Sequence, residues 1–364
     1  MPSYNEKIKE LEDRISKTKY NKKTQNAIGL YKAQLARLKE TQIQRRSGGK
    51  KGEGYSVKKS GDATVILVGF PSVGKSTLLN AMTKTKSAVG AYAFTTLTCI
   101  PGLLEYNHAK IQVLDVPGIV HGAASGRGRG TEVLAVMRTA DLAVILIDVN
   151  YPGHLKVLQN EIYDSGLRLD QRLPDVKIVK KPRGGIDIAS TVKLTKTDFT
   201  IITDVLKEFR IHNADVVIRE DITIDQIIDV IEANKVYIPS LVVLNKIDMV
   251  SDKKLEELRR KIKPDILISG EKKIGIEELK KMIFDKLNFM RVYCKESGKK
   301  ADLDVPLIMK KGATVEDMCS KLHKDFVAKF RFARVWGKSA KFPGQKFMLN
   351  HKLVDGDIAE IHVS

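Results

Sequence analysis

Residues 69–77 read Gly-Phe-Pro-Ser-Val-Gly-Lys-Ser-Thr, and this spacing of glycine, lysine and hydroxyl residues suits phosphate binding. Glycines let the backbone turn its N–H groups inward around an anion, where side chains would collide. Lys75 supplies a positive charge for the β- and γ-phosphates, and the Ser76 hydroxyl suits Mg²⁺. The pattern predicts a nucleotide triphosphate site. Its predicted contact residues are Gly69, Pro71, Ser72, Val73, Gly74, Lys75, Ser76 and Thr77.

The segments on either side of this loop favour the same interpretation. An apolar run from Val65 to Val68 predicts a buried parallel strand that ends at Gly69. Thr77 to Met82 can continue as a helix, whose N-terminal dipole would face the bound anion. The loop is therefore expected between a strand and a helix.

A second motif follows the next predicted strand, Ile111 to Val116, which runs into Asp115-Val-Pro-Gly118. An aspartate at the end of such a strand can hold Mg²⁺ through water, and the glycine amide can sense a γ-phosphate. Alone this spacing is weak, but behind a phosphate loop it is specific. We expect Asp115 and Gly118 to contact the nucleotide or its metal.

A third motif, Asn245-Lys-Ile-Asp248, follows an apolar run from Leu241 to Leu244. The Asp248 carboxylate can accept N1–H and N2–H of guanine together, a pair that adenine cannot offer. Lys246 can lie over the base, and Asn245 can tie this loop to the phosphate loop. Backbone amides of Ser269 and Gly270 can reach the guanine carbonyl oxygen. These motifs, each at the carboxyl end of a strand, predict a guanine-nucleotide site with bound GTP or GDP.

The order of strands and helices predicts an α/β P-loop core with an insertion. Leu142 to Val149 predicts a third strand, and the next parallel strand begins about 75 residues later, far beyond an ordinary connection. Residues 167–238 are therefore expected to form an inserted α+β module. Its predicted elements are a hairpin of residues 177–181 and 186–189, a strand over 216–218 and helices over 198–209 and 224–233.

The two ends of the chain differ from the core. Residues 4–43 predict two helices with a break near residues 21–25, and their thin apolar stripes require something else to pack on. The run rich in Gly, Lys and Arg that follows, residues 45–60, is typical of a flexible linker. It either contacts phosphates of a partner or only keeps the protein soluble. From Met290 a β-grasp-like unit is expected, with one helix over residues 315–326. The predicted domains are 1–60, 61–289 and 290–364.

The formal net charge of +19 is unevenly distributed. Residues 1–60 carry 16 Lys and Arg against 6 Asp and Glu, and residues 290–364 carry 15 against 9. The core between them is nearly balanced, with 32 against 29. Basic ends suggest a polyanionic partner such as RNA, with no DNA specificity expected. The alternative is a generally basic proteome in the source organism.

Trp336 and the loop from Gly337 to Gly344 are the feature of the C-terminal unit that could bind RNA. The loop is basic and has aromatic neighbours, and such loops suit RNA backbones and stacked bases. The alternative is that Trp336 and Phe342 belong to an ordinary core.

Cysteine usage and hydropathy indicate a reducing, aqueous compartment. Cys99, Cys294 and Cys319 are odd in number and widely spaced, which disfavours zinc sites and disulfide frameworks. The first residues lack the apolar core of a signal peptide. No apolar run approaches the ~18 residues that a membrane helix needs. A cytoplasmic protein that does not bind membranes is expected.

Together the motifs resemble the DRG family, within the Obg branch of translation-factor-related GTPases, over essentially the whole chain. The matching residues are Gly69 to Thr77, Phe94 to Leu97, Asp115 to Ala123 and Asn245 to Asp248. The resemblance implies a helical N-terminal domain, an insert similar to a ribosomal-protein domain and a C-terminal TGS domain from about Met290. It also implies ribosome binding and a role in translation.

The resemblance also assigns roles within the switch segments. Thr96 is preferred over Thr95 as the Mg²⁺-binding threonine, although spacing alone does not separate them. The predicted metal set is Ser76, Thr96 and Asp115, and the predicted catalytic set is Lys75, Thr96 and Gly118.

The residue after Gly118 departs from the Ras pattern. Ras-like enzymes place a water-orienting Gln there, whereas this chain has Ile119. Water would be oriented by backbone, by a switch residue or by a partner, and slow intrinsic turnover is expected. Arg127 and Arg129 are either internal arginine fingers or solvated loop charges. Some relatives use K⁺ tied to an Asn where this chain has Ser72, which weakens the inference of potassium dependence.

The sequence thus predicts a Mg²⁺-dependent GTP-hydrolysing switch that associates with the ribosome or rRNA, with a regulatory protein partner left open. The alternative is an RNA-binding adaptor in which the nucleotide is structural, although intact Lys75, Ser76 and Asp115 argue against it. An ATPase is disfavoured by Asp248.

Overall fold

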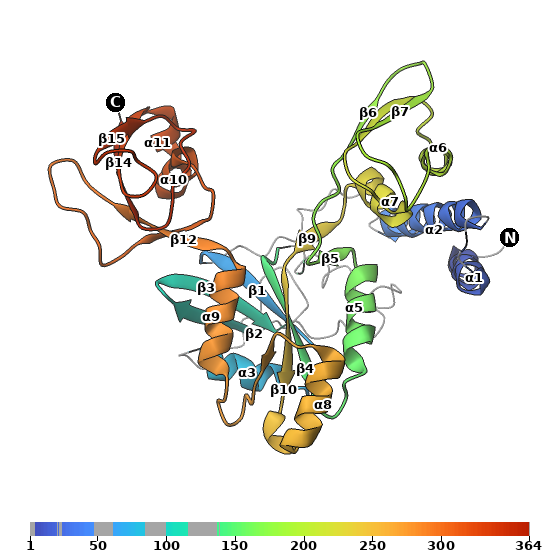
Figure 1. Ribbon diagram of the computed structural model, residues 1–364, viewed down its shortest axis with the longest axis horizontal. Helices are drawn as coiled ribbons and strands as arrows, with labels where there is room; N and C mark the ends of the chain where they lie inside the picture. Colours follow the sequence, from blue (N-terminus) through green and yellow to red (C-terminus); the bar gives the residue numbers. More distant parts are fainter. Residues whose placement is uncertain are drawn as a thin grey trace. The chain divides into compact units, whose positions relative to one another are not determined.

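The computed structural model describes residues 4–19, 21, 24–46, 61–83, 100–115, 137 and 139–363. Its internal contacts divide the chain into two compact units (Figure 1). One unit joins the described parts of Met1–Gly54 to Gln171–Tyr237, and the other joins those of Tyr55–Asp170 to Ile238–Ser364. No helix among the described residues is long and apolar enough to span a membrane.

The second unit is built on a six-stranded sheet with the order β11-β10-β4-β1-β3-β2. Five strands are parallel, and β2 pairs antiparallel with β3 at one edge. The sheet has the α/β P-loop architecture predicted for this segment, and only β2 was not expected. The strands are β1 (Ala63–Val68), β2 (Ile100–Tyr106), β3 (Ala109–Asp115), β4 (Leu142–Asp148), β10 (Ser240–Asn245) and β11 (Ile266–Leu267).

Helices cover both faces of this sheet (Figure 1). Helices α3 (Lys75–Met82) and α9 (Ile276–Lys286) pack on the face that Val65 and Leu67 present. Helix α5 (His154–Asp164) lies on the opposite side. Because both faces are covered, every residue of β1 and β4 is buried, as in parallel sheets generally. The remaining elements of this region are η1 (Ile247–Met249) and α8 (Asp252–Ile262).

The insertion forms a three-stranded sheet, and its strand order corrects one prediction. Residues 177–181 and 186–189 were expected to pair as a hairpin, but the sheet order is β6-β8-β7. Strand β8 lies between the other two, antiparallel to β6 and parallel to β7. The turn at Pro182 to Gly185 therefore spans two strand spacings rather than one. The strands are β6 (Val176–Lys180), β7 (Ile186–Ser190) and β8 (Ala214–Ile218).

The N-terminal helices α1 (Tyr4–Lys17) and α2 (Gln25–Arg46) belong to the same unit as the insertion. Ala33 of α2 is fully buried in the apolar cluster of helices α6 (Phe199–Glu208) and α7 (Ile224–Glu232). Lys32 pairs with the Asp225 carboxylate of α7 at 2.7 Å.

The thin apolar stripe of α2 thus finds its packing partner in the insertion. Gly29 permits the close approach, because a Cβ there would lie 3.2 Å from side-chain atoms of both Ile201 and Ile224. The predicted domains 1–60 and 167–238 are joined by these contacts. The short strands β5 (Leu167–Leu169) and β9 (Val236–Ile238) stand at the two chain ends of the insertion.

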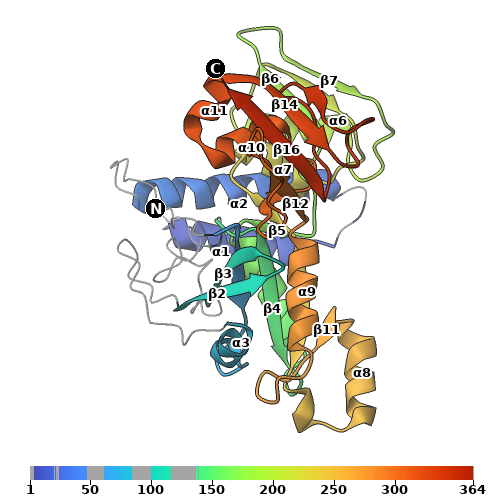
Figure 2. The same cartoon turned by 90° about the vertical axis from the view of Figure 1, so that its left-hand side faces the viewer.

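The C-terminal segment is a β-grasp-like five-stranded sheet with the order β13-β12-β16-β14-β15, as predicted for a TGS-like domain. Figure 2 labels three of its strands, β12, β14 and β16. The single helix expected over residues 315–326 is instead two, α10 (Val315–Leu322) and α11 (Lys324–Ala328). His323 adopts an extended backbone (φ −158°, ψ 141°) that ends one helix and caps the next. The strands are β12 (Phe289–Cys294), β13 (Leu307–Lys310), β14 (Phe330–Trp336), β15 (Gln345–Phe347) and β16 (Asp357–Val363).

Candidate guanine-nucleotide site

The phosphate loop lies between β1 and α3, and two of its glycines are required by space. A Cβ on Gly69 would lie 2.8 Å from the Leu146 carbonyl oxygen, and one on Gly74 would lie 2.6 Å from Asn245 Nδ2. Gly74 also has φ +97°, which L side chains rarely adopt. These close approaches bring the loop against both β4 and the Asn245 motif. The sequence had predicted the turn and the tie to Asn245, but not the close approach to Leu146 of β4.

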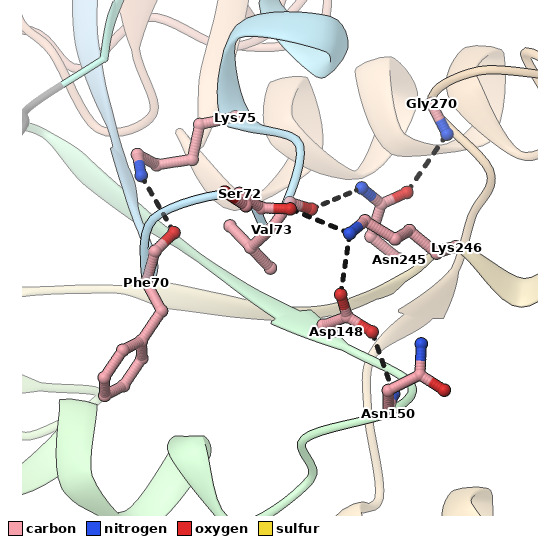
Figure 3. Close-up of polar contacts among 9 residues, drawn as sticks. All are labelled: Phe70, Ser72, Val73, Lys75, Asp148, Asn150, Asn245, Lys246 and Gly270. Atoms are coloured by element: carbon pink, nitrogen blue, oxygen red, sulfur yellow. Dashed lines mark hydrogen bonds and ion pairs between the residues drawn. The ribbon is translucent and has the colours of Figure 1, made fainter.

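Lys75 has two protein acceptors within the phosphate loop. Its ammonium donates to the carbonyl oxygen of Gly69 at 3.0 Å and to that of Phe70 at 3.1 Å, the second of which Figure 3 shows. Burial lowers the pKa of Lys75, and the nearby Asp115 carboxylate opposes that shift. A triphosphate would replace weak carbonyl partners with anionic oxygens, which a partly desolvated ammonium favours. The lysine is therefore held at the loop, ready to change partners.

Ser76 and Asp115 lie together as a metal site requires. The Ser76 hydroxyl donates to Asp115 Oδ2 at 3.0 Å. The other carboxylate oxygen, Oδ1, is buried and has no hydrogen-bond partner among the described residues. A buried carboxylate oxygen without a partner is costly unless a cation or water satisfies it. This donor set of hydroxyl and carboxylate oxygens fits Mg²⁺.

Asn245 ties its loop to the phosphate loop, as predicted, and also to the loop after β11. Its Nδ2 donates to the Val73 carbonyl at 2.9 Å, and its Oδ1 accepts from the Gly270 N–H at 3.0 Å (Figure 3). Only 2% of Asn245 is exposed, so these bonds are shielded from water. The phosphate loop, the end of β10 and the loop after β11 are therefore held by one side chain.

Asp148 is a site residue that sequence reasoning missed. The Lys246 ammonium lies 2.8 Å from Asp148 Oδ2 and donates to the Ser72 carbonyl at 2.7 Å (Figure 3). Burial alone would raise the pKa of Asp148, but hydrogen bonds from Lys246 and the Asn150 N–H lower it overall. The available signal was its position at the carboxyl end of a predicted strand, the same position as Asp115.

Asp248 is held as a carboxylate by its neighbours. A hydrogen bond from the Ser269 hydroxyl lowers its pKa, and Lys272, whose ammonium lies 3.9 Å away, adds to that shift. Ser269 itself is fully buried and its hydroxyl also accepts from the Lys272 N–H at 3.1 Å. The Ser269 side chain, rather than only its backbone, therefore orients the carboxylate that is predicted to read guanine.

The predicted backbone donors to the guanine carbonyl are occupied in this structure. The Ser269 N–H donates to the Ile274 carbonyl at 3.1 Å, and the Gly270 N–H donates to Asn245 at 3.0 Å. Gly270 would have to release or share Asn245 in order to reach a bound base. Ser269 and Gly270 thus lie at the site, but their backbone N–H groups are hydrogen-bonded to other protein groups.

An aromatic stack beside the phosphate loop was also not predicted. The Phe70 ring stacks on His154 with centroids 3.8 Å apart, and Tyr151 stacks on the same imidazole at 5.2 Å. Tyr151 is 59% exposed. The stack joins the loop to the start of α5 and restrains the peptide whose carbonyl accepts from Lys75.

Several predicted residues lie outside the described part of the chain. They are Thr95, Thr96, Gly118, Ile119, Arg127 and Arg129. Their assignments therefore stay predictions. Pro71, Ser72 and Thr77 lie on the exposed side of the phosphate loop, where a ligand could reach them.

Three family models match successive segments of the chain. A model described as a 50S ribosome-binding GTPase matches residues 64–181, and one for the C-terminal region of that domain matches 183–289. A TGS domain model matches 290–363, which confirms the predicted type of the C-terminal domain.

Similar proteins are found in archaea and animals. An uncharacterized GTP-binding protein of Methanocaldococcus jannaschii is 59% identical over 360 residues, covering 98% of this chain and 92% of the relative. Human developmentally-regulated GTP-binding protein 2 is 42% identical over 359 residues, covering 98% of both chains. Among solved structures, an Aquifex aeolicus Era variant bound to GDP·AlF₄⁻ is 22% identical, with a TM-score of 0.34 over 62% of this chain and 56% of that one.

The sequence relatives match nearly from end to end, and the described motif residues gather at one edge of the sheet with the geometry of a guanine-nucleotide site. The chain belongs to the developmentally regulated GTP-binding (DRG) protein family of P-loop GTPases.

Proposed function

We propose that this protein is a Mg²⁺-dependent, slowly hydrolysing GTP switch that binds the ribosome and acts in translation in the cytoplasm. The observation that carries the switch is the Ser76–Asp115 pair. Its buried Oδ1 has no partner among the described residues and points to a cation at the phosphate end of the site.

In this proposal, different residues bind the phosphates, the metal ion and the base of the nucleotide. Lys75 would exchange its two carbonyl acceptors for β- and γ-phosphate oxygens. Ser76 and Asp115 would hold Mg²⁺, which supplies charge stabilisation at the phosphates when bound. Asp248, oriented by Ser269, would select guanine. Thr96 and Gly118 would report the γ-phosphate and so couple hydrolysis to a change of state.

Slow turnover follows from Ile119. An isoleucine side chain has no group that can orient water, so the isolated protein is expected near the unassisted rate of Ras-like enzymes, on the order of 10⁻⁴–10⁻³ s⁻¹. A ribosome or a protein partner would then supply the missing organisation. Turnover near one per second without a partner or added K⁺ would contradict this part of the proposal.

Ribosome binding is supported by two observations of different kinds. The family model over residues 64–181 carries the description of a 50S ribosome-binding GTPase. Most of the +19 net charge lies in residues 1–60 and 290–364. A polyanionic ribonucleoprotein surface is the partner that such charge favours.

The decisive experiment is co-sedimentation of the full chain with ribosomes in the presence of GDP, GTP or a non-hydrolysable GTP analogue. Enrichment with the analogue over GDP is expected for a switch. Single-turnover hydrolysis with and without ribosomes then separates the switch from a passive RNA-binding adaptor. Ribosome binding that ignores the nucleotide, with no hydrolysis on the ribosome, would favour the adaptor.

A further inference from the structure

The C-terminal sheet has one covered and one open face. Ala333 and Val335 of β14 and Ala359 of β16 are buried in a cluster with Val315 and Met318 of α10. Because strand side chains alternate, the residues between them point to the opposite side. We call this opposite side the β14–β15 face. Its charged residues and rings include Lys295, Phe332, Arg334, Trp336, Lys346, Glu360 and His362, and Ile358 lies beside Trp336.

Rings and cations alternate across the β14–β15 face. Phe332 stacks on His362 of the neighbouring strand with centroids 4.3 Å apart, and the Lys346 ammonium lies 4.6 Å from the Phe332 centroid. The Lys295 ammonium lies over the Trp336 ring, 4.8 Å from its centroid. Figure 2 shows β14 and β16, which supply these rings, side by side. A nucleic acid offers bases for rings and phosphates for cations, and this face presents both.

The one acid of this face is already neutralised. Glu360 is 2% exposed, and its two oxygens face the Lys295 ammonium and the His362 imidazole, the latter at 2.6 Å. Burial would raise the pKa of Glu360, but Lys295 and His362 lower it overall. The carboxylate therefore stays charged and holds the Lys295 ammonium and the His362 ring beside it. It leaves no exposed negative charge on this face.

Four further basic residues of this region are exposed: Arg334, Lys338, Lys341 and Lys346. Within the described residues, none of them makes an ion pair with a carboxylate. Residues 315–329, which include α10 and α11 against the other face of the sheet, carry three acids and three lysines and are therefore balanced in charge. The excess positive charge is thus on the open side of the sheet, whereas the helix side is balanced.

The loop from Gly337 to Gly344, which carries Lys338, Lys341 and Phe342, is held rigidly at its base. The fully buried Asp357 carboxylate accepts from the Ser339 N–H at 3.3 Å. A Cβ on Gly337 would lie 2.3 Å from that carboxylate, and the Gly344 N–H donates to the Val335 carbonyl at 3.0 Å. Phe342 is nevertheless 59% exposed at the tip. The loop is therefore preorganised and presents an aromatic ring to solvent, which corrects the alternative that Phe342 is core.

We propose that the β14–β15 face and the Gly337–Gly344 loop bind single-stranded RNA. The inference rests on the proposed ribosome association and specifies which kind of RNA is bound and where. Unpaired bases can stack on rings, while cations track the backbone. A duplex hides its bases and could use only the cations. An acidic polypeptide would likewise leave Phe342 without a role.

The test measures fluorescence anisotropy of a labelled single-stranded RNA of about 12 nucleotides, a length that matches typical single-strand sites. The same strand annealed to its complement serves as the duplex probe. Lys346→Gln is compared with Lys324→Gln, an exposed lysine on α11 that undergoes the same chemical change. Phe342→Leu is compared with Phe342→Trp, which retains a ring. GTP affinity of each variant reports that the chain is folded.

Lys346→Gln should weaken single-strand binding several-fold and make the slope of log affinity against log salt shallower by about 0.7. Lys324→Gln should change neither. Phe342→Leu should weaken binding by about tenfold, and Phe342→Trp should preserve it. Tighter binding of the duplex than of the single strand, or equal effects of Lys346→Gln and Lys324→Gln, would overturn the inference. Competition by poly-glutamate as strong as by RNA would also overturn it.

The same variants separate this inference from the proposed function. If wild-type protein co-sediments with ribosomes while Lys346→Gln and Phe342→Leu bind RNA normally, the inference fails and the proposed function stands. If the face binds RNA as described but wild-type protein never co-sediments with ribosomes, the proposed function fails and the inference stands.

Discussion

The nucleotide edge of the central sheet and the β14–β15 face both gather basic side chains, but the two regions supply them with different partners. Lys75 and Lys246 each donate to carbonyl oxygens of the phosphate loop, and Lys246 also pairs with the buried Asp148. Arg334 and Lys346 are exposed and pair with no carboxylate among the described residues. The basic side chains of the first region already have protein partners, whereas Arg334 and Lys346 of the second are exposed to a ligand.

This difference teaches how each region should bind. At the nucleotide edge a ligand must exchange existing hydrogen bonds, so geometry decides affinity and specificity. At the β14–β15 face a polyanion gains contacts that nothing else makes, so long-range charge decides affinity and salt screens it. Substitutions in the first region should strongly reduce the affinity for one ligand, the nucleotide. Substitutions in the second region should modestly reduce the affinity for many RNA sequences.

The largest effect is expected for Lys75→Ala. The substitution removes the only phosphate-loop cation and with it a charge that would stabilise the transition state. Single-turnover GTP hydrolysis on ribosomes should fall by on the order of 10²–10³-fold. RNA binding should be unchanged, since the β14–β15 face does not use Lys75. A parallel loss of RNA affinity would show that the two regions are not independent.

The next largest effect is expected for Asp248→Asn. The amide cannot accept both guanine N–H groups, so GTP affinity should fall by on the order of 10²-fold. Affinity for xanthosine triphosphate should rise, because its C2 carbonyl can accept from the new amide. Competition of labelled GTP by each nucleotide measures the change. Retained GTP preference would mean that this motif does not read the base.

Salt should separate the two regions in wild-type protein. If about three phosphates are neutralised at the β14–β15 face, a slope of about −2 predicts roughly a twentyfold loss of single-stranded RNA affinity between 50 and 200 mM salt. GTP affinity at saturating Mg²⁺ should change much less over that range, since its contacts are short and partly buried. The measurement is a pair of titrations at matched salt. Equal slopes for both ligands would break the comparison.

The smallest effect is expected for Asp148→Asn. The substitution removes the charge that holds Lys246 beside the phosphate loop, and GTP affinity should fall by about tenfold. The pKa of Asp148 is lowered in the folded protein, so its ion pair is intact above the ordinary carboxylate pKa of about 4 and is lost only as pH falls through the lowered value. Wild-type GTP affinity should therefore not vary between pH 5 and 8 on account of this group. A variant with unchanged GTP affinity would reduce Asp148 to a structural role.

The insertion and the N-terminal helices show where sequence reasoning reached its limit. Periodicity located α2 and its thin apolar stripe, but nothing local identifies its partners Ile201 and Ile224, which lie 172 and 195 residues after Gly29. Deleting residues 1–60 to test charge would therefore uncover the apolar face that buries Ala33. Point substitutions in the β14–β15 face avoid that complication. The false hairpin prediction has the same cause, because β8 reaches its place between β6 and β7 through a long-range pairing.

The sequence by itself determined the α/β class, the TGS-like C-terminal domain and the residues of the three nucleotide motifs, because each motif is local and its chemistry dictates residue type and spacing. The tertiary structure alone decided which groups those residues meet. Asp148 pairs with Lys246, Ser269 orients Asp248, and Asp115 keeps one buried oxygen without a partner among the described residues. Such pairings depend on the distance between strand ends and helix faces far apart in the chain. Hydrogen bonds and packing act over a few ångströms in space, and local sequence patterns carry no measure of that distance.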